Sequence, residues 1–263
     1  MPVNGKSPLI IGHRGASAVA PENTLAAFRQ ALSDGADGVE FDVRLSRDAV
    51  PVVIHDRSLN RTGDRANLVS SMTARELGKV DVGSWFNRRF RSRARDEYSK
   101  ERTPTLEQVF ETVGNSKVLL YVELKSDNSA DEGLVREVVA LINRYDLREL
   151  VVVESFTLAN LQMVKQIDGR IRTAALFEPG RQPLSLLSGR RLIKQTLASH
   201  ADEIALHRSS VNHRVVSAAR DAGLSVVVWT VDTPSWIARA QRLGIKALIT
   251  NRPDEMLRLR DSA

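Results

Sequence analysis

Residues 9–35 read LIIGHRGASAVAPENTLAAFRQALSDG, a short apolar run followed by a stretch with apolar residues at helical spacing. The run at 9–11 suits a strand that is buried on both faces. Asn23 is the predicted N-cap of a helix that passes through Phe28 and ends near Gly35. This strand followed by a helix decides the fold, because the same order recurs along the rest of the chain.

Seven more apolar runs follow, and a predicted helix comes after most of them. The runs lie at 38–43, 118–124, 150–153, 173–177, 203–206, 225–229 and 247–250. The helices are expected at about 105–113, 131–142, 157–167, 190–199, 212–222, 233–243 and 254–260. Alternation of this kind requires parallel strands with helical crossovers, and eight strands close a barrel. The predicted class is therefore α/β, a (β/α)8 TIM barrel, and an open doubly wound sheet is the alternative.

One apolar run breaks this alternation. Residues 52–54 follow the second strand too closely for a crossover helix, so they are expected to fold back as a hairpin or accessory strand. A long charged insertion follows at about 56–103, and it carries five arginines within residues 88–95. Long excursions after barrel strands usually build the walls or lids of active sites. We expect residues 1–263 to form a single barrel domain with this inserted segment.

The composition limits the kind of protein. Apolar residues make up 42% and charged residues 27% of 263, which is typical of a globular chain with a large core. The chain has no cysteine, which excludes disulfides, thiolate metal sites and a cysteine nucleophile. No stretch resembles a signal peptide or reaches the roughly 18 apolar residues of a membrane span. A cytoplasmic protein is the expectation.

The net charge of +6 favours either a nucleic acid or an anionic small molecule as the partner. Aromatic residues are only 5% of the chain, which argues against surfaces that stack on bases, so no nucleic-acid partner is predicted. Much of the excess lies in the run at 88–95. A solvated face is the simpler interpretation of that run, and contact with a membrane surface is compatible with the sequence but not predicted.

Two candidate groups come from the first two strands. His13 and Arg14 follow the first strand directly, at the end where TIM barrels carry their catalytic groups. Glu40 and Asp42 lie two apart in the second strand, so their side chains point to the same side. Buried carboxylates are costly unless they are paired or bind a metal. The alternative is an edge strand on which both acids are solvated.

The accessory strand and the third strand supply the others. His55, followed by Asp56, is either a proton shuttle or part of a satisfied turn. Glu123 and Lys125 share one side of a strand, which fits either a site or a buried ion pair. Carboxylates without cysteine suit Mg²⁺ or Ca²⁺, an arginine and a lysine suit phosphate, and two histidines suit a base and an acid. The set as a whole predicts metal-assisted cleavage of a phosphoester.

At these residues the chain resembles the glycerophosphodiester phosphodiesterase family, within the superfamily of phospholipase C-like phosphodiesterases. The similar stretches are HRGAS at 13–17, APENTLAAF at 20–28, GADGVEFDV at 35–43, PVVIHD at 51–56, RTG at 61–63, GSWF at 83–86, PTLE at 104–107, ELK at 123–125, VWTV at 228–231 and residues 244–253. They span nearly the whole chain in order. Asn251 departs from the aspartate that many members carry, and residues 177–189 are only weakly similar.

The resemblance implies a barrel with an insertion after the second strand and hydrolysis of glycerophosphodiesters to glycerol 3-phosphate and a free alcohol. The implied roles are metal ligands at Glu40, Asp42 and Glu123, an acid–base pair at His13 and His55, phosphate contacts at Arg14 and Lys125, and pocket positions at Glu22 and Trp229. One divalent cation, Mg²⁺ or Ca²⁺, is the implied cofactor. The attacking group is either a glycerol hydroxyl, which gives a cyclic phosphate, or water. The alternative activity is that of a lysophospholipase D-type or related lipid phosphodiesterase on the same fold.

Overall fold

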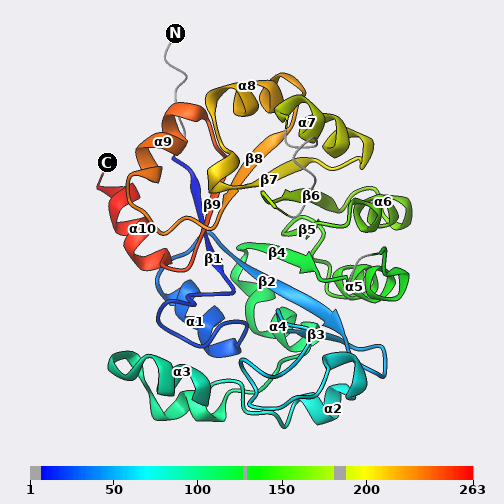
Figure 1. Ribbon diagram of the computed structural model, residues 1–263, viewed down its shortest axis with the longest axis vertical. Helices are drawn as coiled ribbons and strands as arrows, with labels where there is room; N and C mark the ends of the chain where they lie inside the picture. The colour runs from blue at the N-terminus through cyan, green and yellow to red at the C-terminus, as the bar shows by residue number, and fades with distance from the viewer. Residues whose placement is uncertain (1–6, 127–128, 181–187, 263) are drawn as a thin grey trace.

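The computed structural model describes residues 7–126, 129–180 and 188–262 (Figure 1). Its barrel strands are β1 (Leu9–His13), β2 (Gly38–Leu45), β4 (Leu119–Leu124), β5 (Val151–Ser155), β6 (Arg172–Phe177), β7 (Glu203–His207), β8 (Ser225–Trp229) and β9 (Ala247–Thr250). They pair in parallel in the order β1-β9-β8-β7-β6-β5-β4-β2, and pairing of β1 with β2 closes the ring. The predicted TIM barrel is confirmed, and the open sheet is wrong because it would leave β1 and β2 apart.

Helices lie outside the strands and cover them (Figure 1). They are α1 (Leu25–Ser33), α4 (Leu106–Val113), α5 (Glu132–Arg144), α6 (Leu158–Ile167), α7 (Gly189–Ala198), α8 (His213–Asp221), α9 (Trp236–Leu243) and α10 (Pro253–Asp261). Their apolar stripes pack on the outward faces of the strands in one large core. Thr105 and Asp131 cap α4 and α5 with their side chains, which places these two helix starts where polar N-cap residues predict them.

The N-cap of α1 differs from the prediction. The side chain of Thr24, not that of Asn23, accepts a hydrogen bond from the backbone N–H of Ala27 at 3.2 Å. Asn23 has a left-handed backbone, with φ of 57°, and its side chain turns toward β2. Adjacent polar residues both have the chemistry of a cap, so local sequence does not separate them.

The inserted segment begins with β3 (Pro51–Val53), which pairs antiparallel with β2 and confirms the predicted hairpin. It continues through η1 (Val69–Ser71), α2 (Ala74–Leu77), α3 (Ser84–Arg89), η2 (Arg91–Arg93) and η3 (Asp96–Lys100), at one end of the molecule (Figure 1). Elsewhere among the described residues lie the short 3₁₀ turns η4 (Gly114–Ser116) and η6 (Arg208–Ser210). Phe86 and Tyr98 of the insertion pack on Ala20 and Ala27, so the segment is anchored to the first strand–helix unit.

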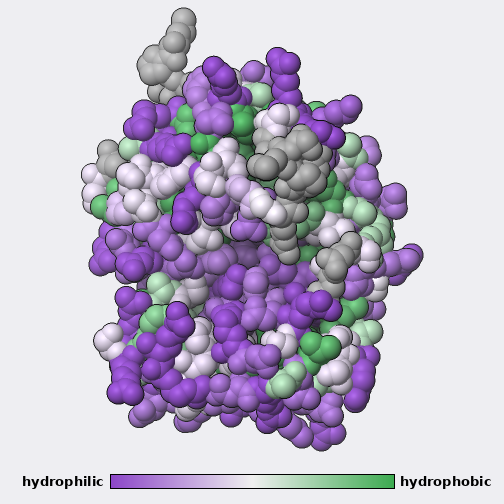
Figure 2. All heavy atoms as spheres, viewed as in Figure 1, coloured by the Kyte–Doolittle hydropathy of each residue, from purple (hydrophilic) through white to green (hydrophobic). Residues whose placement is uncertain are grey.

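The surface is mostly hydrophilic on the face seen in Figure 2, over the centre of the molecule and over the insertion. Among the described residues, the large apolar side chains that are exposed are Leu68, Ile167, Leu197 and Leu259. Within residues 7–126, 129–180 and 188–262, no helix has the length and apolar character that a membrane crossing requires.

The turn after β1 depends on a glycine. Arg14 and Gly15 both have left-handed backbones, with φ of 53° and 80°, and the N–H of Gly15 donates to the carbonyl of Gly12 at 3.1 Å. A Cβ on Gly15 would lie 2.6 Å from the backbone carbonyl of Ala27 in α1. Only glycine therefore allows the chain to turn here and still pack against α1.

We predict that Gly15→Ala destabilises the fold more than Gly35→Ala. Gly35 has a similar φ of 87° but nothing within 4 Å of a Cβ, so it carries only the left-handed cost of about 1–2 kcal/mol. Gly15→Ala adds a steric clash, for a total of about 2–4 kcal/mol. Urea unfolding of both variants measures the difference, and equal losses would contradict the packing argument.

Candidate active site

The barrel interior leads directly to the candidate site. A core separate from the outer one fills the barrel and includes Ile11, Tyr121, Val152 and Val227. Alternate residues of a strand share a face, so two residues further along each strand another side chain points inward at the mouth. These steps lead from Ile11 to His13, from Tyr121 to Glu123, from Val152 to Glu154 and from Val227 to Trp229.

These side chains line a cavity of about 430 Å³, which we call the active-site cavity. Its lining contains seven of the predicted site residues: His13, Arg14, Glu40, His55, Glu123, Lys125 and Trp229. Asp42 lies beneath it and is only 1% exposed. Glu22 lines a neighbouring cavity that shares His13 and Arg14 with this one. The structure therefore brings seven of the nine predicted residues together around one cavity, with Asp42 beneath it and Glu22 beside it.

Three carboxylates form the floor of this site. Glu40, Asp42 and Glu123 each offer an oxygen, and these oxygens lie within 4.8 Å of one another. All three residues are buried. The register explains the meeting, because Asp42 pairs with Glu123 across the ladder between β2 and β4.

Two cations face these carboxylates. Lys125 Nζ lies 3.0 Å from Asp42 Oδ1 and 2.7 Å from Glu123 Oε1. Arg14 Nε lies 3.1 Å from Asp42 Oδ2, and the backbone N–H of Arg14 donates to Glu40 Oε2 at 3.0 Å. The edge-strand alternative for Glu40 and Asp42 is therefore wrong, because both are enclosed in the barrel.

Asn23 also belongs to this floor, although its sequence position suggested a helix cap. Its side-chain amide donates to Asp42 Oδ2 at 2.7 Å, and its side-chain oxygen accepts from the backbone N–H of Asp42 at 3.3 Å. The left-handed backbone at Asn23 turns the side chain toward β2. It thereby fixes the orientation of one carboxylate.

The surroundings separate the protonation of the acids. Burial by itself would raise the pKa of Asp42, but Lys125 and Arg14 hold it well below its usual range. Burial raises the pKa of Glu40 well above its usual range, and the charges of Asp42 and Glu123 raise it further. Burial also raises the pKa of Glu123. The site thus contains more carboxyl groups than Arg14 and Lys125 can neutralise.

Glu154 is a further acid that the sequence analysis missed. It is 1% exposed, lines the active-site cavity, and its Oε2 has no hydrogen-bond partner. Burial raises its pKa well above the usual range, and the neighbouring acid Glu40 raises it further. The signal was present, because Glu154 comes directly after the apolar run at 150–153, at the end of a predicted strand as Glu123 is.

His13 is held by an amide. Asn251 Nδ2 donates to Asp232 Oδ2 at 2.7 Å, so Asn251 Oδ1 is the atom that faces His13 Nδ1, at 2.7 Å. An amide oxygen only accepts, so His13 Nδ1 carries the hydrogen and Nε2 is bare in the neutral ring. That Nε2 lies 3.9 Å from Glu40 Oε2. Burial, together with Arg14, lowers the pKa of His13 from 6.5 to about 4.

His55 has a different partner. Its Nδ1 lies 2.6 Å from Asp56 Oδ1, and Arg61 Nε donates to the other oxygen of Asp56 at 2.7 Å. Arg61 also donates twice to Glu22, which in turn accepts from Arg14 Nη1 at 2.7 Å. Glu22 therefore bridges the two arginines, and an ionic chain links the inserted segment to the turn after β1.

Trp229 closes one side of the cavity at the end of β8. Its ring meets the edge of Phe156, with centroids 5.6 Å apart, and lies 5.4 Å from His207. Its indole N–H is buried without a hydrogen-bond partner. The aromatic packing holds the ring in place at the side of the cavity.

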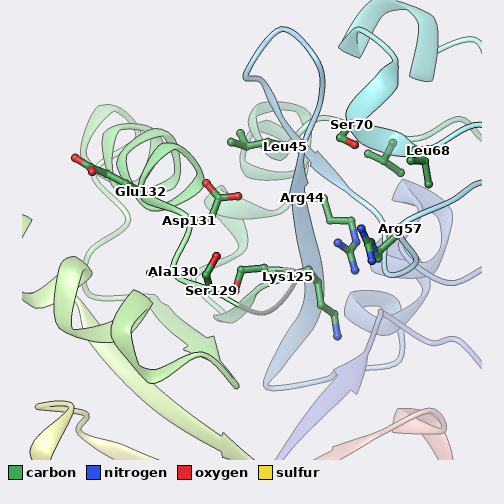
Figure 3. Close-up of a pocket in the computed structure, with 12 residues that line it drawn as sticks. Arg44, Leu45, Arg57, Leu68, Ser70, Lys125, Ser129, Ala130, Asp131 and Glu132 are labelled. Carbon is green, nitrogen blue, oxygen red and sulfur yellow. The ribbon is translucent and has the colours of Figure 1, made fainter.

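A second pocket, of about 340 Å³, also has Lys125 in its lining. Figure 3 shows the residues that line it. The side chains of Arg44 and Arg57 lie next to each other on one side of it, and Ser129 and Asp131 lie across from them. Of the predicted site residues, Lys125 alone is among the described residues that line it. This pocket flanks the candidate active site and does not contain it.

Fold and cavity together define a TIM-barrel enzyme. The profile of the Glycerophosphoryl diester phosphodiesterase family matches residues 13–255, nearly the whole chain. The chain belongs to this family and is by class a phosphoric diester hydrolase.

Individual relatives are similar to this chain along nearly their full length. The glycerophosphodiester phosphodiesterase of Caldanaerobacter subterraneus subsp. tengcongensis is 32% identical over 254 residues, covering 95% of this chain and 97% of the relative. A phosphodiesterase of Oleispira antarctica, solved in complex with the product sn-glycerol-3-phosphate, has a TM-score of 0.84 at 27% identity, with 97% of each chain covered. The glycerophosphodiester phosphodiesterase from Agrobacterium tumefaciens str. C58 has a TM-score of 0.75 at 28% identity, covering 95% of this chain and 98% of the other.

We predict that Glu40→Gln stabilises the protein in EDTA at pH 8, by about 1–3 kcal/mol. The pKa of Glu40 is raised in the folded state, so its contribution to stability falls as the pH rises above 4.5 and is fully lost above the raised pKa. Glutamine keeps the shape and removes the charge. Urea unfolding at pH 8 and pH 5 measures the effect, which should shrink at pH 5; a variant less stable at both values contradicts it.

Proposed function

We propose that the chain hydrolyses glycerophosphodiesters to glycerol 3-phosphate and a free alcohol, with the barrel and its inserted segment acting as one domain. The observation that carries this proposal is the gathering of two histidines, three carboxylates and two cations around the active-site cavity. The relatives' names supply the substrate class, and the Oleispira antarctica complex supplies the product. His13 and His55 exchange protons with the substrate, and Arg14 and Lys125 contact its phosphate.

The partners of the two histidines support different roles for them. His13 is neutral, and its bare Nε2 faces the cavity, so it takes the proton from the attacking hydroxyl or water. His55 has the carboxylate of Asp56 behind it, whereas His13 has only an amide. A carboxylate only accepts hydrogen bonds, so it orients the ring through Nδ1–H, and His55 is assigned the donation of a proton to the departing alcohol.

A divalent cation fits the floor of the cavity. Four buried carboxylates, those of Glu40, Asp42, Glu123 and Glu154, outnumber the two cations beside them, Arg14 and Lys125, and Glu154 Oε2 lacks a partner among the described residues. Glu40, Asp42 and Glu123 would hold the ion, and oxygen ligands without cysteine suit Mg²⁺ or Ca²⁺. When bound, such an ion offsets the negative charge that develops on the phosphoryl group.

The arginine and lysine are held ready for an anion. Arg14 is fixed by Glu22 and Asp42, and Lys125 by Asp42 and Glu123, so neither side chain needs to be ordered when substrate binds. Each keeps N–H groups beyond those contacts, and both line the cavity. Donors placed in advance cost little reorganisation during the reaction.

Removing either histidine tests the acid–base assignment. His13→Ala and His55→Ala should each lower kcat on glycerophosphocholine by about a hundred- to ten-thousand-fold, because each removes one proton-transfer group. Thermal unfolding should show that both variants remain folded. Near-normal kcat in either variant would remove that histidine from the mechanism.

Removal of divalent ions tests the cation and the substrate together. EDTA should abolish hydrolysis of glycerophosphocholine, and Mg²⁺ or Ca²⁺ should restore it. At a hundred times its Kd, the ion should add about 2.7 kcal/mol of stability, roughly 5–10 °C in Tm. Glu123→Ala should lose this rise in Tm. Full activity in EDTA contradicts the cation, and a preference for a lyso-lipid with the same headgroup contradicts the substrate class.

The acid side of the pH profile tests the state of His13. The pKa of His13 is about 4, so the ring stays neutral as the pH falls from 7 to 5, where an ordinary imidazole would gain a proton. With saturating cation, kcat/KM should therefore lose little through His13 above pH 5. An acid limb with its midpoint near 6.5 would show that the base is an unperturbed histidine.

A further inference from the structure

A cavity rich in arginine opens beside the active-site cavity. It has a volume of about 720 Å³ and shares His13 and Arg14 with its neighbour. Six arginines and three carboxylates line it, namely Arg14, Arg61, Arg88, Arg89, Arg93 and Arg252 with Glu22, Asp64 and Asp232. The active-site cavity has the opposite balance, four carboxylates (Glu40, Glu123, Glu154 and Glu178) against the two cations Arg14 and Lys125.

The carboxylates of this arginine cavity are already engaged. Glu22 is shared by Arg14 and Arg61, and Asp64 pairs with Arg88. Asp232 accepts hydrogen bonds from the side chains of Thr250 and Asn251 and from the backbone of Asn251. Glu22 and Asp64 are therefore already paired with other arginines, and Asp232, which is held by neutral donors, forms no ion pair with an arginine among the described residues.

Two arginines of the cavity keep an uncompensated charge. Within the described part of the chain, no carboxylate lies within ion-pairing distance of Arg89 or Arg93. Arg89 lies over the ring of Phe90, 5.6 Å from its centroid, and Arg93 Nη1 donates to the carbonyl of Ala18 at 2.6 Å. That last bond fixes η2 against the turn after β1. Both guanidinium groups retain N–H donors in the planar geometry that suits phosphate or carboxylate.

The two cavities meet where the phosphate contacts lie. A phosphodiester carries two alcohol arms on one phosphorus, and Arg14 and His13 line both cavities, so each arm has a space of its own. We infer that the arginine cavity binds an anionic group, phosphate or carboxylate, carried by the substrate's alcohol arm. This inference rests on the proposed function and narrows its substrate class to diesters whose alcohol is itself negatively charged.

A matched pair of substrates tests this subsite. Glycerophosphoglycerol and its derivative with a terminal phosphate on the alcohol differ only in the added anion. The ratio of their kcat/KM values, followed as loss of the diester phosphorus signal, should favour the phosphorylated diester about ten- to a hundred-fold, mainly through KM. The ratio should fall toward one in 0.5 M salt, because screening weakens exposed charges.

Arg89→Gln, on α3, should reduce this ratio at least fivefold. Arg93→Gln, on η2, should also reduce it. Arg91→Gln is the matched control, because Arg91 is an exposed arginine of the same run that does not line the cavity. It should keep the wild-type ratio. Tm values of all three variants check that the fold is retained.

The outcomes separate the subsite from the activity. If wild-type protein cleaves neither diester, both the proposed function and this inference are contradicted. If it cleaves both with a ratio near one, the function stands and the subsite is overturned. If Arg89→Gln keeps the ratio, while Arg89→Gln and Arg91→Gln weaken binding to phosphatidylglycerol vesicles equally, the run contacts lipid surfaces and the subsite is again overturned.

Discussion

Repulsion among the carboxylates of β2 and β4 is strong, because their oxygens lie within 4.8 Å in a buried setting of low dielectric. Contacts with neighbouring residues partly offset this repulsion. Lys125 lies between two of the acids, the turn at Arg14 directs both a backbone N–H and a guanidinium at them, and Asn23 donates to Asp42. The glycine after Arg14 makes that turn possible. A charge imbalance remains after these contacts, and a bound dication would offset it.

The two histidines show how partners give one side-chain type two properties. His13 is half-buried beside a positive charge and held by an amide, and these surroundings keep it neutral. His55 is held by Asp56, which Arg61 orients in turn. The chain from Asp56 through Arg61 to Glu22 connects this histidine to Arg14. Residues of the inserted segment therefore help to hold His55 and Arg14 in position at the mouth of the barrel.

The inserted segment has a packing role and a charge role. Phe86 and Tyr98 bury their rings against the first strand–helix unit, which fixes the segment without covering the active-site cavity. The arginines on the same short helices then point into the space beside Arg14. A barrel with one acidic and one basic cavity around a shared pair of residues can distinguish the two arms of a diester by their charge.

The sequence alone determined the fold class and much of the candidate site. The alternation of apolar runs with helical stretches predicted the barrel, and period-two spacing placed Glu40 with Asp42 and Glu123 with Lys125, because both patterns are local consequences of backbone geometry. Other features depended on tertiary contacts. Asn251 reaches His13 across 238 residues, and Glu154 becomes part of the site only because β5 lies beside β4. Only the closed barrel brings such residues together. The tertiary structure therefore decided which nitrogen of His13 is bare and which of the described arginines have no carboxylate within ion-pairing distance.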